Sequence, residues 1–148
     1  MSNNTKSVVP SASFSLIGYK FDQVSLDFAG LNQSSEFGID IIPSGIFDEK
    51  EGVFYLTFEF MLLDFTQKPS TIMRVLCNAS FEFNGVHKLA DIPEYFYVNS
   101  IAILFPYLRA FVSTVTLQAN IAPFIIPTLN LGGLKEELVR KTTVKNEQ

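Results

Sequence analysis

Apolar and polar residues alternate along much of the first half of the chain. Alternation with a period of two is typical of β-strands that bury one of their faces. It is clearest over residues 52–65 and 71–83, and shorter stretches of it occur at residues 24–28 and 37–41. The pattern therefore predicts two short strands followed by two long ones.

The two long strands each have one face that is almost entirely apolar. Such a face must pack against another element, whereas the opposite faces mix apolar residues with polar and charged ones. We therefore expect the apolar faces to form the core. Their residues are Phe54, Leu56, Phe58, Phe60 and Leu62 in the first long strand, and Met73, Val75, Cys77, Ala79, Phe81 and Phe83 in the second.

The residues after Gly85 have a helical rather than an alternating pattern. Asp91 and Glu94 have the spacing of a capping box, in which two side chains satisfy free N–H groups at a helix start. The pattern predicts a helix whose first position is Ile92 or Pro93.

Pro106 lies inside the apolar stretch that follows this helix start. Because proline removes a backbone hydrogen bond and clashes with the preceding turn, we expect the helix to break near residues 100–106. A sheet can cover only one side of the helical segment beyond the break, yet that segment is apolar around most of its circumference. Its polar stripe is limited to Arg109, Ser113 and Thr116.

Residues 121–134 contain two prolines, two glycines and no charge, which predicts an ordered but irregular segment. Loops are usually polar because water satisfies their backbone, so the apolar side chains of this loop require an apolar partner. A short amphipathic helix is expected at about residues 133–141. Strands followed by helices define the α+β class.

Composition supports a single domain that has apolar surface to spare. The chain has 148 residues, of which 47% are hydrophobic and only 18% charged, and 15 are Phe. Charge is too scarce to solvate the whole surface of a monomer, which indicates apolar surface reserved for subunit contacts or a ligand. The predicted domain covers residues 13–141, between a disordered arm at residues 1–12 and a flexible tail at residues 142–148.

Charge and cysteine content exclude several classes of function. The net charge is −4 and basic residues do not cluster, so nucleic-acid binding is not expected. The start of the chain lacks the pattern of a secretory signal, and no uncharged apolar run reaches the roughly 20 residues that span a bilayer. The single Cys77 agrees with a reducing compartment. We therefore predict a cytoplasmic protein without membrane insertion.

Candidate catalytic and metal-ligating groups are sparse. His87 is the only histidine and has no oriented partner in sequence, and Cys77 lies on a predicted core face. The acidic residues of 48–51 lack the spacing of a calcium loop. We therefore expect neither catalysis nor a metal or other cofactor. The carboxylates on or near the polar faces of the strands, Asp22, Asp27, Glu59 and Glu82, fit either a solvated sheet face or an acidic docking patch.

The segment "ILFPYLR" (103–109), followed by "APFIIPTLNL", resembles the signature region of SecB, the tetrameric cytoplasmic chaperone of protein export. Upstream, "FDQVSLDF", "GVFYLTFEFMLL" and "VLCNASFEFNGV" are similar to strands of that family. The resemblance covers roughly residues 14–140. It implies a four-stranded antiparallel sheet followed by a long helix, a connecting loop and a short C-terminal helix, assembled as a homotetramer that is a dimer of dimers.

The activity implied by the resemblance is to hold unfolded precursor polypeptides in apolar grooves and to hand them to the SecA ATPase. Long apolar grooves without polar groups that demand one sequence would suit such clients. The resemblance requires neither nucleotide nor metal. It implies a groove wall formed by Ile121, Phe124, Ile126 and Leu129, and we expect a groove floor formed by Val53, Tyr55, Met61 and Leu63.

The docking site for SecA implied by the resemblance maps onto Asp27, Leu76 and the position of Asn78. Leu76 and Cys77 match a Leu-Cys-Glu stretch of the family, but Asn78 replaces its glutamate. This difference leaves a second hypothesis open, a SecB-like chaperone dedicated to one client such as the antitoxin of a toxin–antitoxin system. A third hypothesis, a small-molecule enzyme, lacks a nucleophile, a base and a ligand cluster.

Overall fold

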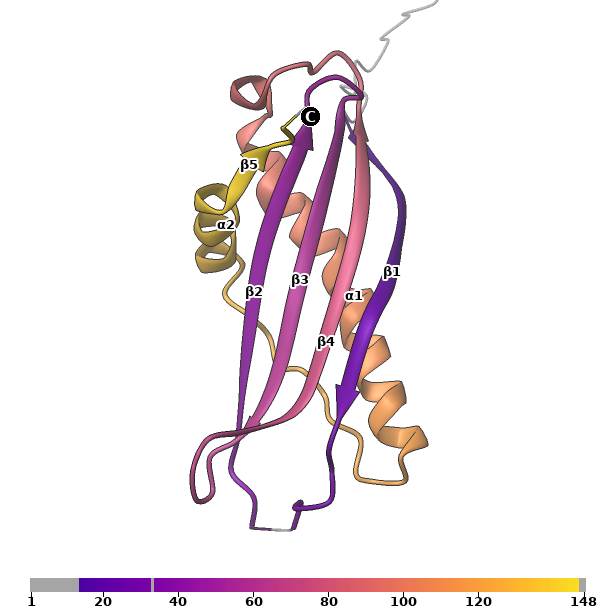
Figure 1. The fold of residues 1–148 in the computed structure, drawn as a ribbon, viewed down its shortest axis with the longest axis vertical. Helices are drawn as coiled ribbons and strands as arrows, with labels where there is room; N and C mark the ends of the chain where they lie inside the picture. The colour runs from indigo at the N-terminus through magenta and orange to yellow at the C-terminus, as the bar shows by residue number, and fades with distance from the viewer. Residues whose placement is uncertain (1–13, 33, 147–148) are drawn as a thin grey trace, which may run out of the picture.

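The computed structural model describes residues 14–32 and 34–146. Within them a long sheet packs against one long helix and one short helix (Figure 1). The predicted arm at residues 1–12 lies outside the described residues. The elements in chain order are β1 (Phe14–Leu26), β2 (Phe37–Asp48), β3 (Val53–Asp64), β4 (Ser70–Phe83), a 3-10 turn (Leu89–Asp91), α1 (Glu94–Gln118), α2 (Leu131–Arg140) and β5 (Thr142–Val144).

The sheet has the strand order β1-β4-β3-β2-β5. Its first four strands pair antiparallel, and β5 adds to the outer edge of β2 in parallel. The α+β class and the four antiparallel strands are confirmed. The fifth strand was not predicted.

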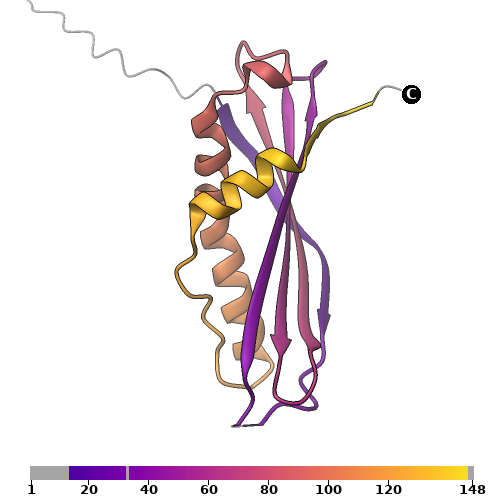
Figure 2. The same cartoon turned by 90° about the vertical axis from the view of Figure 1, so that its left-hand side faces the viewer.

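The core lies between one face of the sheet and α1. Every predicted core residue of β3 and β4 is buried. Figures 1 and 2 show α1 along this face, while the opposite face carries no helix. The ring of Phe96 lies 4.8 Å from that of Phe54 and 4.7 Å from that of Phe83, which joins the start of α1 to the sheet. We call this side of the sheet the helix face and the other side the open face.

The predicted break near residues 100–106 is wrong, because α1 is one continuous helix with Pro106 inside it. Leu104 and Leu108, which flank the proline, are both fully buried against the sheet. Pro106 and Ala102 lie on the exposed side of the helix, so the carbonyl that loses its hydrogen bond can bond to water. Burial of the inner face outweighs the local cost of the proline.

The predicted capping box also does not form. Asp91 ends the short turn Leu89–Asp91, and α1 begins only at Glu94, after Pro93 in an extended conformation. The Glu94 carboxylate lies 2.6 Å from the ammonium group of Lys135 on α2. Glu94 therefore connects the two helices instead of closing a cap.

The C-terminal part differs from the prediction at both of its ends. Helix α2 begins two residues earlier than expected, because the Asn130 side chain accepts the N–H groups of Gly132 and Gly133. The predicted tail at residues 142–148 begins with β5 instead of an unstructured segment. Its strand forms because Gly45–Phe47 on β2 offers an open edge.

Helix α1 is long and apolar enough to cross a membrane, judged by length and composition alone. Uncharged runs do not reveal this property, because Arg109 interrupts the apolar sequence of α1. The apolar residues of its inner face, including Ile101, Leu104, Leu108 and Val112, form the core with the sheet. Packing against the sheet therefore accounts for the apolar inner face of α1.

Candidate functional site

An apolar hollow lies on the helix face, at the end of the molecule where α1 ends. It has a volume of about 390 Å³ and is bordered by the β1–β2 connection, β2, β3 and the segment after α1. Phe124 forms an edge-on contact with Phe37 of β2, with ring centroids 6.2 Å apart. We call this space the Phe124 hollow; its apolar lining residues are Phe28, Leu31, Phe37, Leu62, Ile121, Ala122 and Phe124.

The hydroxyl of Thr116 holds Phe124 at this hollow. Thr116 is fully buried near the end of α1, and its oxygen accepts the N–H of Phe124 at 2.9 Å. The hydroxyl can donate to the carbonyl of Val112 or Ser113, at 3.1 and 2.9 Å. Thr116 belongs to the polar stripe predicted for the helix. Its helical spacing from Leu108 and Val112, both buried, was the signal that it points inward.

A second hollow lies further along β2, between that strand and α2. Its volume is about 310 Å³, and its apolar lining residues are Ile39, Ile41, Leu129 and Leu134. The segment 119–130 connects the two hollows along the chain and approaches β2 at both. We call the second space the Leu129 hollow.

The edge of β2 beside these hollows has no strand partner among the described residues. Only Gly45–Phe47 pairs with β5, which leaves Phe37–Ser44 unpaired on that side. The N–H of Gly45 and the C=O of Phe47 point to the outer side. By strand alternation, Ile39 and Ile41 present their backbone groups on the same side. Free backbone groups, with no N–H at Pro43, are thus adjacent to the apolar hollows.

The structure does not bring the predicted groove wall and floor together within one subunit. Ile121, Phe124 and Leu129 line the two hollows of the helix face, but Ile126 is fully buried in the core and cannot contact a ligand. The expected floor lies on the open face, because alternate residues of β3 point to opposite sides of the sheet. These open-face residues are Val53, Tyr55, Met61 and Leu63.

The open face carries a polar network centred on Asn78. The Asn78 amide donates to the Asp22 carboxylate and accepts the hydroxyl of Thr57 at 2.6 Å. The Lys20 ammonium lies 3.1 Å from Asp22. The hydrogen bond from Asn78, and next the one from Lys20, lower the pKa of Asp22 below its ordinary value. The carboxylate at this place is therefore ionised and already partnered.

The residues predicted for docking to SecA are not gathered in one place. Leu76 and Asn78 share the open face of β4, where Asn78 lies opposite Lys20 of β1. Asp27 follows the far end of β1, and its N–H bonds to the carbonyl of Ile72. The intervening length of strand separates Asp27 from Asn78.

Apolar surface remains exposed where β1 crosses α1. Tyr19 stacks on Tyr107 and Phe21 on Phe111, with ring centroids 4.3 and 4.0 Å apart. Ile17 on β1 and Tyr95, Ile103 and Leu117 along α1 are also exposed, and β1 itself is an edge strand of the sheet. Helix α1, which is apolar around most of its circumference, is therefore covered on only one side in the single subunit.

The groups considered for catalysis remain isolated. Burial, with a smaller effect of the Asp22 charge, raises the pKa of the Cys77 thiol to about 12, so it is protonated at neutral pH. His87 is exposed on the link between β4 and α1. In residues 14–32 and 34–146, three or more potential metal ligands do not come together.

A four-stranded antiparallel sheet with a long helix, a short helix and apolar hollows under the connecting segment defines the SecB-like class of fold. The chain is similar to the SecB-like chaperone Rv1957 of Mycobacterium tuberculosis, solved in complex with a ChAD peptide from the Rv1956 HigA1 antitoxin. The TM-score is 0.61, the identity 15%, and the match covers 80% of this chain and 92% of that chain.

A sequence relative is the uncharacterized protein MJ0357 of Methanocaldococcus jannaschii, which is 49% identical over 53 residues. The match covers 34% of this chain and spans only 34% of that relative's length. No protein-family model matches the chain.

Proposed function

We propose that the protein is a molecular chaperone that binds non-native polypeptide segments on its helix face, without catalysis and without a cofactor. The observation that carries this proposal is the pair of apolar hollows beside the unpaired edge Phe37–Ser44. The likeness to a SecB-like chaperone that binds an antitoxin peptide supports it.

The chemistry of this region suits clients of varied sequence. The lining of the Phe124 hollow is mainly apolar, and the Leu129 hollow places four apolar side chains beside Asp40, Asn130 and Glu137. The apolar side chains favour aliphatic and aromatic groups without demanding one order of residues. The backbone groups of Ile39 and Ile41 offer hydrogen bonds that do not depend on client sequence. Unfolded chains expose both kinds of partner, whereas folded ones bury them.

Assembly into a homotetramer, a dimer of dimers, is part of the proposal. The exposed rings of Tyr19 and Tyr107, the exposed Ile103 and Leu117, and the edge position of β1 support it. Such a surface needs a second copy to remove it from water. The resemblance to SecB adds that two sheets join and that the long helices lie between dimers, in the cytoplasm.

Two forms of this function compete, and the open face favours one of them. A general export chaperone would hand its clients to SecA through an acidic surface, but Asp22 is partnered by Asn78 and Lys20, and Glu59 pairs with Arg74 at 3.2 Å. A chaperone dedicated to one client, as an antitoxin would be, needs no such surface. These ion pairs favour the dedicated form.

The binding site is tested by matched substitutions on the two faces of the sheet. Phe124→Gln and Leu129→Gln are expected to weaken binding of reduced, carboxymethylated α-lactalbumin by about tenfold or more, roughly one lost apolar contact. Tyr55→Gln, on the open face, is the control and should bind as the parent does. If Tyr55→Gln loses binding while Phe124→Gln and Leu129→Gln do not, the binding site lies on the open face instead.

The two forms are separated by a panel of unrelated unfolded precursors and purified SecA. A dedicated chaperone should bind few members of the panel and should not bind SecA. Binding to most of the precursors together with SecA would establish the export function instead.

A further inference from the structure

The C-terminal strand β5 occupies part of the same β2 edge that borders the Leu129 hollow. It pairs in parallel with Gly45–Phe47, and its first residue, Thr142, lies opposite Gly45, next to the end of the free stretch Phe37–Ser44. A polypeptide segment aligned on the free stretch would therefore run into β5. How much of the edge is open depends on whether β5 is in place.

The attachment of β5 through its backbone is short. The strand has three residues, and its flanking bonds are Gly45 N–H to the Lys141 carbonyl at 3.3 Å and Lys145 N–H to the Phe47 carbonyl at 2.9 Å. A strand with so few ladder bonds opens more readily than the long strands of the core.

The side chains of β5 add little to the buried core. Val144 and Thr142 are only partly covered and Thr143 is exposed. The preceding helix α2 is held separately, by the fully buried Leu138 and by the ion pair between Lys135 and Glu94 at 2.6 Å. The strand can therefore leave β2 while α2 stays in place.

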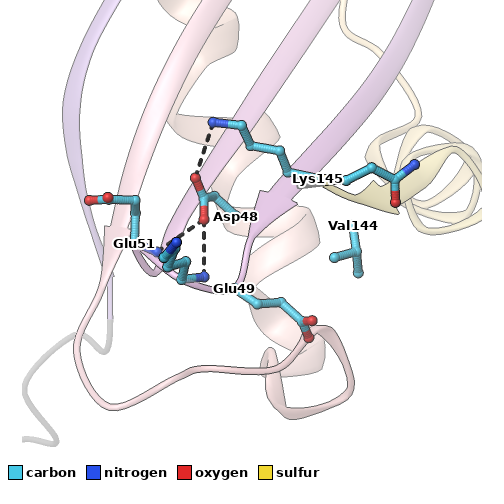
Figure 3. A pocket seen from close by; sticks show the side chains of 7 residues that line it. Asp48, Glu49, Glu51, Val144 and Lys145 are labelled. Atoms are coloured by element: carbon cyan, nitrogen blue, oxygen red, sulfur yellow. Dashed lines mark hydrogen bonds and ion pairs between the residues drawn. The ribbon is translucent and has the colours of Figure 1, made fainter. Parts of the chain in front are cut away.

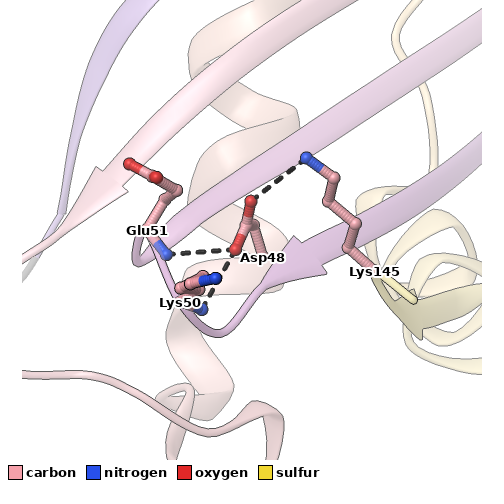
Figure 4. Close-up of polar contacts among 4 residues, drawn as sticks. All are labelled: Asp48, Lys50, Glu51 and Lys145. Atoms are coloured by element: carbon pink, nitrogen blue, oxygen red, sulfur yellow. Dashed lines mark hydrogen bonds and ion pairs between the residues drawn. The ribbon is translucent and has the colours of Figure 1, made fainter. Parts of the chain in front are cut away.

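One ion pair fastens the end of β5 to the sheet. The Lys145 ammonium lies 3.3 Å from the carboxylate of Asp48, the last residue of β2 (Figures 3 and 4). Asp48 is only 6% exposed, whereas the Lys145 side chain is 57% exposed. Lys145 can therefore return to water at small cost.

The Asp48 carboxylate does not depend on Lys145 for hydrogen bonds. One of its oxygens accepts the N–H groups of Lys50 and Glu51, each at 3.0 Å, in the turn between β2 and β3 (Figure 4). When Lys145 leaves, the buried charge keeps these two partners, so the usual penalty for an unpaired buried charge does not arise. The ion pair between Lys145 and Asp48 can therefore break and form again.

We propose that β5 is a displaceable clasp, which competes with bound polypeptide for the edge of β2 and so regulates how much of that edge a client can use. With the clasp closed, a client pairs only along Phe37–Ser44. With it open, the edge beyond Gly45, up to Asp48, is accessible as well. The inference rests on the proposed function, because it concerns the same edge and the same class of client.

The clasp is tested by locking it closed. Ile46 and Thr143 are paired directly in the register and both are exposed, so Ile46→Cys with Thr143→Cys can join β5 to β2 by a disulfide. Cys77 is buried with a raised thiol pKa and does not compete for this bond. The oxidised and reduced forms of this lock variant then differ only in the disulfide between residues 46 and 143.

Binding of reduced, carboxymethylated α-lactalbumin is measured for the oxidised and re-reduced lock variant, after the excess reductant has been removed. The reduced form should bind at least about fivefold more tightly than the oxidised form, since it alone can free the edge. A chain ending at Lys141 should bind as tightly as the reduced form or more tightly. Lys145→Gln is expected to fall between the parent and that shortened chain.

Hydrogen exchange of the Phe47 amide, which by strand alternation faces β5, reports the state of the clasp in each variant. If variants differ in hydrogen exchange at this position but bind the α-lactalbumin probe with equal affinity, the clasp proposal is wrong. Absence of binding in every form, the parent included, would instead contradict the proposed chaperone function. If the shortened chain does not fold, the oxidised and reduced pair decides alone.

Discussion

The side-chain amide of Asn78 donates a hydrogen bond to the carboxylate of Asp22 across the β4–β1 pair, while its oxygen accepts the hydroxyl of Thr57. A side chain that both donates and accepts is needed to satisfy Asp22 and Thr57 together. A glutamate at residue 78, as in the SecB family, would put two carboxylates side by side. The negative charge on this part of the open face is supplied by Asp22 instead.

We predict that Asn78→Glu lowers the melting temperature by several degrees near neutral pH, because like charges then meet and one hydrogen bond is lost. Thermal unfolding followed by circular dichroism measures the change. The double variant Asp22→Asn with Asn78→Glu exchanges the two groups and should recover most of the loss. A single variant as stable as the parent would contradict the pairing.

Thr116→Val should loosen the segment after α1. The substitution keeps the shape of the side chain but leaves the N–H of Phe124 without its partner, which costs about 1–3 kcal/mol of unfolding free energy. Urea unfolding gives this cost, and binding of the α-lactalbumin probe should weaken in parallel because Phe124 lines its hollow.

Thr114→Val is the matched control, since Thr114 lies on the same helix but is exposed. It should change neither stability nor binding. Thr116→Ser keeps the hydroxyl and should bind like the parent. If Thr116→Val binds the α-lactalbumin probe with unchanged affinity, the hydrogen bond between Phe124 and Thr116 is not needed for binding.

The core of this protein could be predicted from the sequence because burial and strand period act locally. The even-numbered residues Phe54 to Leu62 face the helix as their alternation indicates, and the same logic holds for β4. The class of fold and the order of its main elements followed from that pattern and from the resemblance.

The site was harder to predict because it depends on contacts between distant segments. The predicted floor, with Tyr55 and Met61, has an apolar composition but lies on the other side of the sheet from the connecting segment. The anchoring of Phe124 by Thr116 and the capture of β5 by the β2 edge are tertiary contacts that leave no periodic signal. The helix break predicted at Pro106 was wrong for a related reason. The local cost of the proline is offset by packing elsewhere along α1.

Acid should weaken the clasp through the part of the Asp48 pKa shift that comes from Lys145, because the N–H partners of Asp48 stay in place when β5 leaves. The N–H of Glu51 most strongly, then the Lys145 ammonium and the N–H of Lys50, lower the pKa of Asp48 from its ordinary 3.8. A carboxylate with a lowered pKa in the folded state stabilises that state fully above pH 3.8 and loses this effect as the pH falls through the lowered value. Glu49, Lys50, Glu51 and Lys145 are the charged residues that line this region.

We therefore expect the amides of Thr142–Val144 to lose hydrogen-exchange protection below pH 3.8, after correction for intrinsic exchange. Asp48→Asn should show weaker protection at neutral pH and a smaller change with acid. An identical acid transition in Asp48→Asn would assign the opening to another group.

The exposed surface around β1 and α1 should hold the assembly together. Light scattering coupled to size exclusion is expected to give a mass about four times the 16.6 kDa of one chain. Ile103→Asp with Leu117→Asp places two charges in the apolar surface and should reduce that mass, because burying unpaired charge is costly.

Val139→Asp is the control for this surface, since Val139 is exposed on α2 and away from β1. It should keep the parent mass. If the parent is a stable monomer, the exposed rings of Tyr19 and Tyr107 have no partner copy to cover them. If only Val139→Asp dissociates, the copies meet through α2 instead of through α1, and the placement of the long helices between dimers is wrong.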